Sequence, residues 1–399
     1  MLLVTPWYPP TIGGVATVAE RLHRLFLAAG VVSRVWLCDG QAHGRVDPDG
    51  RVIYRWIPDT AFYTRSARAV LATLARAPFA LWEAYRIVRR HGIRTVVLVY
   101  PTGYAWPFIA LRMLGVINLV SSCHGNEILK FATSSGLATR LFRAVLRRCD
   151  AITVPAAHLI PEAAKLLPDR TLPIWLIPNC VDDTYFVPKA EARPTNGPSS
   201  LIHISAFTPR KRTLDIVRAF ALARGLPPDC RLVMVGIGPE YEAARALATS
   251  EGVAERVDFI GAPDDVRPYL WNADVLVMAS DEESGPLTLL EAMACEVPWI
   301  MTPWGIAMTL PRGEYGEIVP GRAPDRLAAT MEQMLSDRPR LRAMGARGRL
   351  KVEEAFGQAR YLERHLDLLR AVERGEGDAA IDYSAAAVAA PLGPVSRGA

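Results

Sequence analysis

Two carboxylates, Glu283 and Glu291, stand eight positions apart around the expected start of a helix. The apolar run 275–278 before them predicts a buried strand. Pro286 suits the first helical position, because the N–H that proline lacks would be unpaired there, and Gly285 would then be the N-cap. The pattern predicts a strand that leads directly into an open helix N-terminus.

Backbone N–H groups at such a helix start, here those of Leu287 and Thr288, have no partner within the helix. Together with the positive end of the helix dipole they favour an anion, and phosphate above all. Glu283 before this site and Glu291 inside the helix could hold hydroxyl groups on either side of the phosphate. These residues therefore predict a site for a nucleotide sugar.

Three consecutive basic residues, Arg210, Lys211 and Arg212, follow the predicted strand 201–204. Lysine is an effective point charge for phosphate, so we expect Lys211 to bind a diphosphate leaving group. The alternative interpretation is an ordinary solvated basic cluster on the surface.

Two turns in the first half of the chain also follow predicted strands. Gly13 and Gly14 come between the strand 2–5 and a helix, which is either a second anion site or a plain structural turn. His124 follows another strand and shares its loop with Glu127. Such a histidine is either functional or a satisfied core residue.

Half of the 399 residues are apolar and 22% are charged, which indicates a globular chain of about two domains. The six cysteines are scattered without a Cys-x-x-Cys pair, which favours reduced thiols, no metal centre and no disulfide framework. The N-terminus lacks the features of a signal peptide, and no uninterrupted apolar stretch suits a membrane span. We expect a cytoplasmic protein that is soluble or peripheral.

Positive charge is concentrated in the first half of the chain. Residues 1–190 contain 22 Lys/Arg and 12 Asp/Glu, whereas the remainder contains 24 and 29. The segments 63–94 and 137–148 are rich in arginine, and the first also carries aromatic residues. Such basic helices either form solvated faces or adhere to an anionic membrane surface or a phosphorylated acceptor. Nucleic acid is not an expected partner, because no recognisable binding module accompanies the charge.

Short apolar strands alternate with amphipathic helices, which predicts parallel sheets flanked by helices. The expected strands are residues 2–5, 34–37, 95–99, 119–121, 151–154, 175–177, 201–204, 231–235, 257–260, 275–278 and 299–301. A break rich in proline and glycine separates two doubly wound α/β domains, 1–187 and 201–355, through a linker at 188–200. A helix at 356–374 and a disordered tail at 375–399 follow.

An ordered set of motifs resembles the family-4 retaining glycosyltransferases (glycosyltransferase group 1). They are Tyr8-Pro-Pro-x-x-Gly-Gly14, His124-Gly, Ile177-Pro-Asn-x-Val-Asp182, Pro209-Arg-Lys211, Val235-Gly-x-Gly-Pro239 and Glu283-x7-Glu291. The resemblance covers nearly the whole chain and implies the GT-B fold, in which two Rossmann-like domains face each other across a cleft. The first domain would lie on the acceptor side and the second would bind the nucleotide sugar. The helix at 356–374 would return to the first domain.

The resemblance also implies roles for single residues. Lys211 would neutralise the donor diphosphate, Glu283 would hold hydroxyls of the transferred sugar, and Glu291 would hold the nucleotide ribose. The donor would also contact the backbone of Gly285, Leu287 and Thr288.

In the first domain, the resemblance implies that His124 would lie by the C6 side of the sugar and that Gly14 would border donor and acceptor. An arginine that is common in the family is replaced here within Ser205-Ala206. Arg210 or Arg212 could take its place.

Taken as a whole, the resemblance implies a retaining, metal-independent hexosyltransferase without a cofactor. It would move a sugar from a UDP- or GDP-linked donor to a lipid-linked or saccharide acceptor in cell-surface polysaccharide or glycolipid assembly. Front-face attack would leave stabilisation of the departing diphosphate as the main contribution of the protein. Two alternatives stay open: a GT-B nucleotide-sugar epimerase, and a non-catalytic nucleotide-binding membrane scaffold.

Overall fold

The computed structural model describes residues 1–11, 13–38, 46, 49, 51–54, 67–101, 103–168, 172–190 and 197–375. The chain divides into two compact units, and each is described by itself. The first comprises Met1–Pro178 and the described chain from Tyr361, and the second comprises Asn179–Arg360. The first unit therefore ends at Pro178, before the boundary expected at residue 187. Of the expected tail, residues 376–399 lie outside the described ranges.

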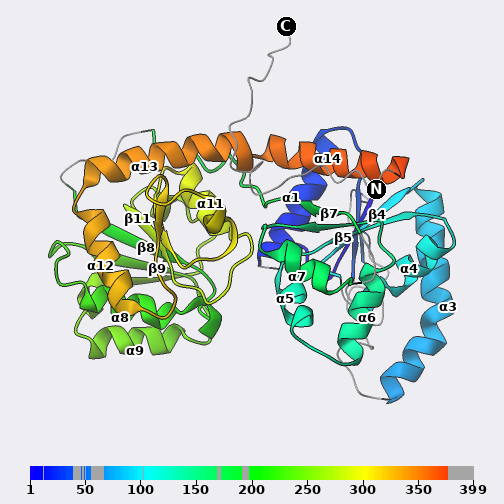
Figure 1. Cartoon of the computed structure of the whole chain (residues 1–399), viewed down its shortest axis with the longest axis horizontal. Coiled ribbons are helices and arrows are strands. Elements are labelled where there is room, and N and C mark those ends of the chain that lie inside the picture. The colour runs from blue at the N-terminus through cyan, green and yellow to red at the C-terminus, as the bar shows by residue number, and fades with distance from the viewer. Residues whose placement is uncertain are drawn as a thin grey trace, which may run out of the picture. The chain divides into compact units, whose positions relative to one another are not determined.

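The first unit is built on a seven-stranded parallel sheet flanked by helices (Figure 1). The strands are β1 (Leu2–Thr5), β2 (Arg34–Leu37), β3 (Val52–Tyr54), β4 (Thr95–Val99), β5 (Asn118–Ser122), β6 (Ala151–Val154) and β7 (Ile174–Leu176). The helices are α1 (Gly14–Ala28), α3 (Ala67–Arg90), α4 (Trp106–Met113), α5 (Asn126–Ala132), α6 (Leu137–Leu146) and α7 (Leu159–Lys165). The last helix, α14 (Gln358–Arg374), belongs to this unit from Tyr361 onward.

The second unit contains a six-stranded parallel sheet, again flanked by helices (Figure 1). Its strands are β8 (Ser200–Ile204), β9 (Arg231–Val235), β10 (Val257–Gly261), β11 (Val275–Met278), β12 (Trp299–Met301) and β13 (Gly316–Ile318). Its helices are α8 (Thr213–Leu222), α9 (Tyr241–Ser250), α10 (Arg267–Leu270), α11 (Leu287–Ala294), α12 (Pro324–Leu335) and α13 (Arg338–Lys351). Short helical turns include η2 (Pro209–Lys211), η4 (Gly305–Thr309) and the π-helix η5 (Val352–Phe356).

Both sheets have the strand order of a Rossmann fold. The first runs β3-β2-β1-β4-β5-β6-β7 and the second runs β10-β9-β8-β11-β12-β13. In each, the chain winds outward to one side of the first strand and then to the other. The strand order therefore reverses between β1 and β4 and again between β8 and β11. Ligands of such sheets bind beyond the carboxyl ends of the strands at this switch point.

The central strands explain why the sequence shows continuous apolar runs. Every residue of β1, β4 and β11 is buried. Parallel strands lie between two layers of helices, so both faces need apolar side chains. The expected strands 2–5, 34–37, 95–99, 151–154, 231–235, 275–278 and 299–301 have the bounds that the sequence predicted.

Two short strands were not among the expected ones: β3 and β13. Each has three residues, which is too short for a clear hydrophobic period. The strand expected at 175–177 lies one residue earlier, as β7.

Candidate active site

Lys211 and Glu283 lie at the switch point of the second sheet. Lys211 ends η2, which follows β8, and Glu283 lies in the loop that follows β11. Since β8 and β11 are neighbouring parallel strands, their carboxyl ends lie at the same edge of the sheet. The sheet order therefore brings together two residues that are far apart in the sequence.

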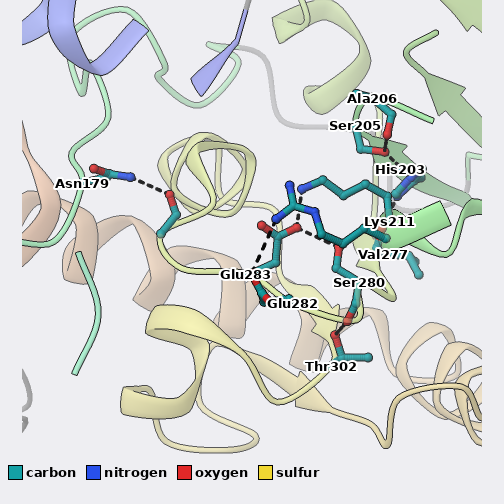
Figure 2. Close-up of polar contacts among 12 residues, drawn as sticks. Asn179, His203, Ser205, Ala206, Lys211, Val277, Ser280, Glu282, Glu283 and Thr302 are labelled. Carbon is teal, nitrogen blue, oxygen red and sulfur yellow. Dashed lines mark hydrogen bonds and ion pairs between the residues drawn. The ribbon is translucent and has the colours of Figure 1, made fainter. Parts of the chain in front are cut away.

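The two side chains form an ion pair, in which Lys211 Nζ donates to Glu283 Oε1 (Figure 2). The pair is largely removed from solvent, with 16% of the lysine side chain and 7% of the glutamate side chain exposed. Ser280 Oγ donates to the same carboxylate oxygen at 2.7 Å. Thr302 Oγ1 in turn donates to the carbonyl of Ser280 at 2.6 Å. A buried chain of hydrogen bonds thus holds Glu283 against the end of the sheet.

The start of α11 differs from the expectation in one detail. Pro286 is the N-cap, with φ −65° and ψ 117°, and the helix begins at Leu287. The expectation that Gly285 would be the N-cap was therefore wrong, because the extended ψ of Pro286 keeps the proline outside the helix. No side chain caps this helix start, and Asn179 Nδ2 donates to the carbonyl of Gly285 at 2.7 Å.

Gly305 controls how closely the loop after β12 approaches Glu283. Its φ is +64°, and an added Cβ would lie 2.5 Å from the carbonyl oxygen of Ser284. Only glycine adopts this backbone conformation without strain and leaves room for the neighbouring chain. The loop that carries Glu283 is therefore held by close backbone packing as well as by hydrogen bonds.

The two arginines beside Lys211 have different surroundings. Arg212 is held by Asp215, with Nη2 2.7 Å from Oδ2, and its Nε lies 4.0 Å from Asp281. Arg210 is more exposed and lies 3.9 Å from Glu282. Arg322 donates hydrogen bonds to Asp281 and thereby lowers the pKa of that carboxyl group. Burial raises the pKa of Glu282.

His203 is a buried neutral group beneath this site. Burial lowers its pKa to about 4. Its Nδ1 lies 2.8 Å from the carbonyl of Val277, which only accepts, so the proton is on Nδ1. Nε2 then accepts from Ser205 Oγ at 2.8 Å (Figure 2). This histidine therefore adds no positive charge next to Lys211 at neutral pH.

The switch point of the first sheet carries aromatic residues instead of an ion pair. Trp7 follows β1 and Tyr100 follows β4, and their ring centroids lie 4.8 Å apart at 61°. Trp7 is 40% exposed. Further along the same loop, Gly13 caps α1 and Gly14 begins it, and no side chain caps this helix start. A Cβ on either glycine would meet nothing within 4 Å.

His124 and Glu127 form a second polar group in the first unit. Glu127 Oε1 accepts from the backbone N–H of His124 at 2.5 Å. Within the described chain, His124 Nε2 and Glu127 Oε2 are buried without a hydrogen-bond partner. Burial lowers the pKa of His124 to about 4 and raises that of Glu127 to about 7. The His124 side chain is therefore uncharged near neutral pH, whereas the Glu127 carboxyl is only partly ionised.

The residues that the sequence singled out fall into two groups. Lys211, Glu283 and the residues at the start of α11 meet at one sheet edge in the second unit, with Glu291 further along α11. Gly14 and His124 lie in the first unit, at the start of α1 and in the loop between β5 and α5.

Sequence reasoning missed Ser280, Thr302, His203 and the Trp7–Tyr100 pair. The available signal was position. His203 lies within β8, and the other residues come one or two positions after strands of the sheets.

Family models match both halves of the chain. Residues 12–185 match the model described as glycosyltransferase family 4, and residues 189–351 match the model for glycosyl transferases group 1.

Two curated relatives cover most of the chain. The N-acetyl-alpha-D-glucosaminyl L-malate synthase of Bacillus anthracis is 31% identical over 67% of this chain and 73% of its own length. The GDP-mannose-dependent alpha-(1-6)-phosphatidylinositol monomannoside mannosyltransferase of Mycobacterium tuberculosis is 28% identical over 88% of this chain and 92% of its own length.

Solved structures share the fold at low sequence identity. Sucrose-phosphate synthase from Thermosynechococcus elongatus has a TM-score of 0.73 and 21% identity, covering 94% of this chain and 99% of its own. Anabaena HepE in complex with UDP has a TM-score of 0.75 and 14% identity, covering 93% and 100%. The two parallel α/β sheets and these neighbours show the GT-B fold. Together with the family matches and the relative at 31% identity, they show that the chain belongs to glycosyltransferase family 4, the group 1 glycosyl transferases.

Proposed function

We propose that the protein is a retaining, metal-independent hexosyltransferase that moves a sugar from a nucleotide-sugar donor to a lipid-linked or saccharide acceptor. The observation that carries the proposal is the Lys211–Glu283 pair at the switch point, beside the uncapped start of α11. A cation, a carboxylate and helix N–H groups at one edge of a Rossmann-like sheet suit a diphosphate with a sugar attached.

In the proposed reaction, the protein mainly stabilises the leaving diphosphate. Lys211 supplies a fixed positive charge, and the N–H groups of Leu287 and Thr288 supply the positive end of the α11 dipole. Charge that develops on the diphosphate oxygen as the glycosidic bond breaks is thereby compensated without a metal. The acceptor oxygen attacks from the same face of the sugar and gives its proton to the departing diphosphate oxygen, so the anomeric configuration is retained.

Glu283 binds sugar hydroxyls in this proposal and does not transfer a proton. Its Oε1 already accepts hydrogen bonds from Lys211 and Ser280. Within the described ranges no protein group bonds to Oε2, so this oxygen is available to accept from the sugar. Glu291, further along α11, binds the ribose of the nucleotide.

The remaining assigned residues complete the donor site. Arg210 is a better candidate than Arg212 for a second contact to the diphosphate, because 42% of its side chain is exposed compared with 30% for Arg212. Gly14 borders the donor and the acceptor, where the open space at its Cβ position leaves room for a ligand. His124 contacts the transferred sugar near C6 through Nε2.

The relatives suggest which donors and acceptors to test. One relative is named for GDP-mannose and a phosphatidylinositol monomannoside, and a structural neighbour is in complex with UDP. We propose a UDP- or GDP-linked hexose as the donor, an acceptor of cell-surface polysaccharide or glycolipid assembly, and no further cofactor.

The decisive experiment incubates the purified protein with UDP- and GDP-hexoses, with and without acceptors, and analyses the products by mass spectrometry and NMR. We expect a new α-glycoside from an α-linked donor only when an acceptor is present. Sugar release or epimerisation that needs no acceptor would instead identify an epimerase. Binding of a nucleotide sugar without turnover would identify a scaffold, and a β-glycoside would refute retention.

The first unit also offers a surface for an anionic membrane, on helix α3. The aromatic side chains Phe79, Trp82 and Tyr85 are 55%, 51% and 45% exposed, at helical spacing. Arg86 lies over the Trp82 ring at 4.9 Å, and Arg89 and Arg90 are exposed on the same helix. The acidic residue nearest to them on this helix, Glu83, is buried.

A face of aromatic rings and arginines suits the interface of a membrane with anionic lipids. No helix in the described part of the chain is both long and apolar enough to cross a bilayer. Peripheral attachment at the inner face of the cell membrane is therefore proposed.

Arginines on α6 were expected to form a second basic face. The helix ends at Leu146, so Arg147 and Arg148 lie beyond it. Leu137 on α6 is 68% exposed, but α6 has no exposed aromatic residue. For this reason α3 is the proposed membrane face.

Flotation with liposomes of phosphatidylcholine alone or with phosphatidylglycerol tests this face. We expect binding only to the anionic liposomes, and about a tenfold loss in a Trp82→Ala, Arg89→Gln variant. An Arg140→Gln variant removes the same single charge from α6, is the charge-matched control and should bind normally. Absence of the wild-type protein from anionic liposomes at low salt refutes the attachment.

A further inference from the structure

The aromatic pair Trp7–Tyr100 lies at the switch point of the first sheet, as the Lys211–Glu283 pair lies at the switch point of the second. Each pair consists of the residues that follow the two strands of the switch point. The rings of Trp7 and Tyr100 meet at 61°, so the edge of one ring contacts the other. Trp7 is 40% exposed, so part of its indole ring is open to a ligand.

Hydrogen bonds fix the backbone on both sides of this pair. The buried hydroxyl of Thr5 donates to the carbonyl of Trp7 at 2.8 Å and accepts from its N–H at 3.2 Å. The hydroxyl of Tyr104 donates to the carbonyl of Val99 at 2.7 Å, beside the carbonyl of Val4 at 3.3 Å. The ends of β1 and β4 are thereby joined, and the rings are presented on a rigid edge.

Tyr100 also has a backbone conformation that is unfavourable for its side chain. Its φ is +58°, in the left-handed region that residues with a Cβ rarely adopt. Strain of this kind persists where the surrounding structure enforces it, and it concentrates at ligand sites. Glycine would fit this backbone better, so the presence of tyrosine points to a use for the ring.

We infer that the Trp7–Tyr100 pair binds the sugar ring of the acceptor. This inference rests on the proposed function, since it assigns the acceptor side of the same reaction. The aromatic faces pack against the C–H groups of a sugar ring, and the indole N–H donates to a hydroxyl. The pair carries no charge, so it suits a neutral ring better than the phosphates of the donor, for which the second sheet carries Lys211.

The test measures binding of methyl α-D-mannopyranoside, myo-inositol and L-malate by NMR, each in the presence of saturating UDP or GDP. Trp7→Ala should raise the Kd of the ring compounds about tenfold, and Trp7→Phe about threefold. The Kd of UDP or GDP should stay within about twofold, because the nucleotide does not contact the pair in this assignment. Leu114→Ala removes another exposed apolar side chain of the same unit and is the control.

Tyr100→Gly separates binding from folding. Glycine relieves the strain at φ +58°, so the melting temperature should not fall by more than about 3 °C while the affinity for the ring compounds drops. Unchanged ring affinity in Trp7→Ala, no ring binding by the wild type, or weaker nucleotide binding in Trp7→Ala would each overturn the inference. If the wild type transfers sugar while these variants bind normally, only the acceptor assignment fails and the proposed function stands.

Discussion

The two sheets of this protein share one strand order, and their switch points carry different chemistry. In the second sheet a lysine and a glutamate form a nearly buried ion pair. In the first sheet a tryptophan and a tyrosine form a partly exposed aromatic pair. Topology therefore determines where a ligand can bind, whereas the residues after the strands determine which ligand it is.

The carboxylates of the two units also differ in whether the protein balances their charge. Glu283 is compensated by Lys211 and Ser280, so its charge is balanced within the protein. Glu127 and His124 are buried with one unpartnered atom each in the described chain, and near neutral pH the histidine is uncharged and the glutamate only partly ionised. The second unit is thus prepared for a charged ligand, and the first unit offers uncharged polar and aromatic groups.

The largest expected effect comes from removing the charge at the second switch point. Lys211→Ala and Glu283→Ala should each lower kcat/KM for transfer by about a thousandfold, because the compensation of the diphosphate or the hold on the sugar is lost. Lys351→Ala, which breaks the pair of the buried Lys351 with the partly exposed Glu354 in the same unit, is the control and should retain transfer. Substantial turnover in either site variant, measured on folded protein, would contradict the roles assigned here.

The next effect concerns the buried carboxyl group of Glu127 in the first unit. Burial raises the pKa of Glu127 from 4.5 to about 7, so its contribution to stability is full below pH 4.5. That contribution is lost as the pH rises through about 7. As the pH rises from 4.5 to about 7, the unfolding free energy of the wild type should fall by up to about 3 kcal/mol relative to that of Glu127→Gln. Urea unfolding at a series of pH values measures the difference, and parallel curves for the two proteins would show that Glu127 is not desolvated.

A third comparison tests how firmly the loop of Glu283 is packed. Gly305→Ala should reduce stability by about 2 kcal/mol, because φ is +64° and the new Cβ would meet Ser284. Gly252→Ala has a similar φ of +71° but open space at Cβ, and should cost about 1 kcal/mol. Donor affinity should fall only in Gly305→Ala. Equal losses in the two variants would mean that close packing adds nothing to the backbone strain.

The smallest effect should come from Ser280. Ser280→Ala removes one hydrogen bond to a charged carboxylate and should lower kcat/KM about tenfold, with Ser280→Thr restoring most of it. Ser199→Ala removes a buried serine bonded to Arg338 before the start of β8 and is the matched control. If Ser280→Ala and Ser199→Ala affect transfer equally, Ser280 does not position Glu283.

Much of the fold and part of the site could be predicted from local pattern. Apolar runs marked the buried strands, and Pro286 marked the start of α11 to within one residue. Lys211 and Glu283 were found because a run of basic residues and a pair of glutamates in the loops after strands stand out in the sequence. Ser280 and Thr302 were not, because a hydroxyl after a strand is common and its partner lies on another loop.

The amino-acid sequence by itself determined the type and order of the elements, since hydrophobic period and turn residues act between chain neighbours. It also determined the family through the order of its motifs. Only the tertiary structure decided that β8 lies beside β11, and with it that Lys211 meets Glu283. The same holds for Trp7 and Tyr100, which meet because β1 lies beside β4. Strand order depends on packing between distant segments, which no local pattern records.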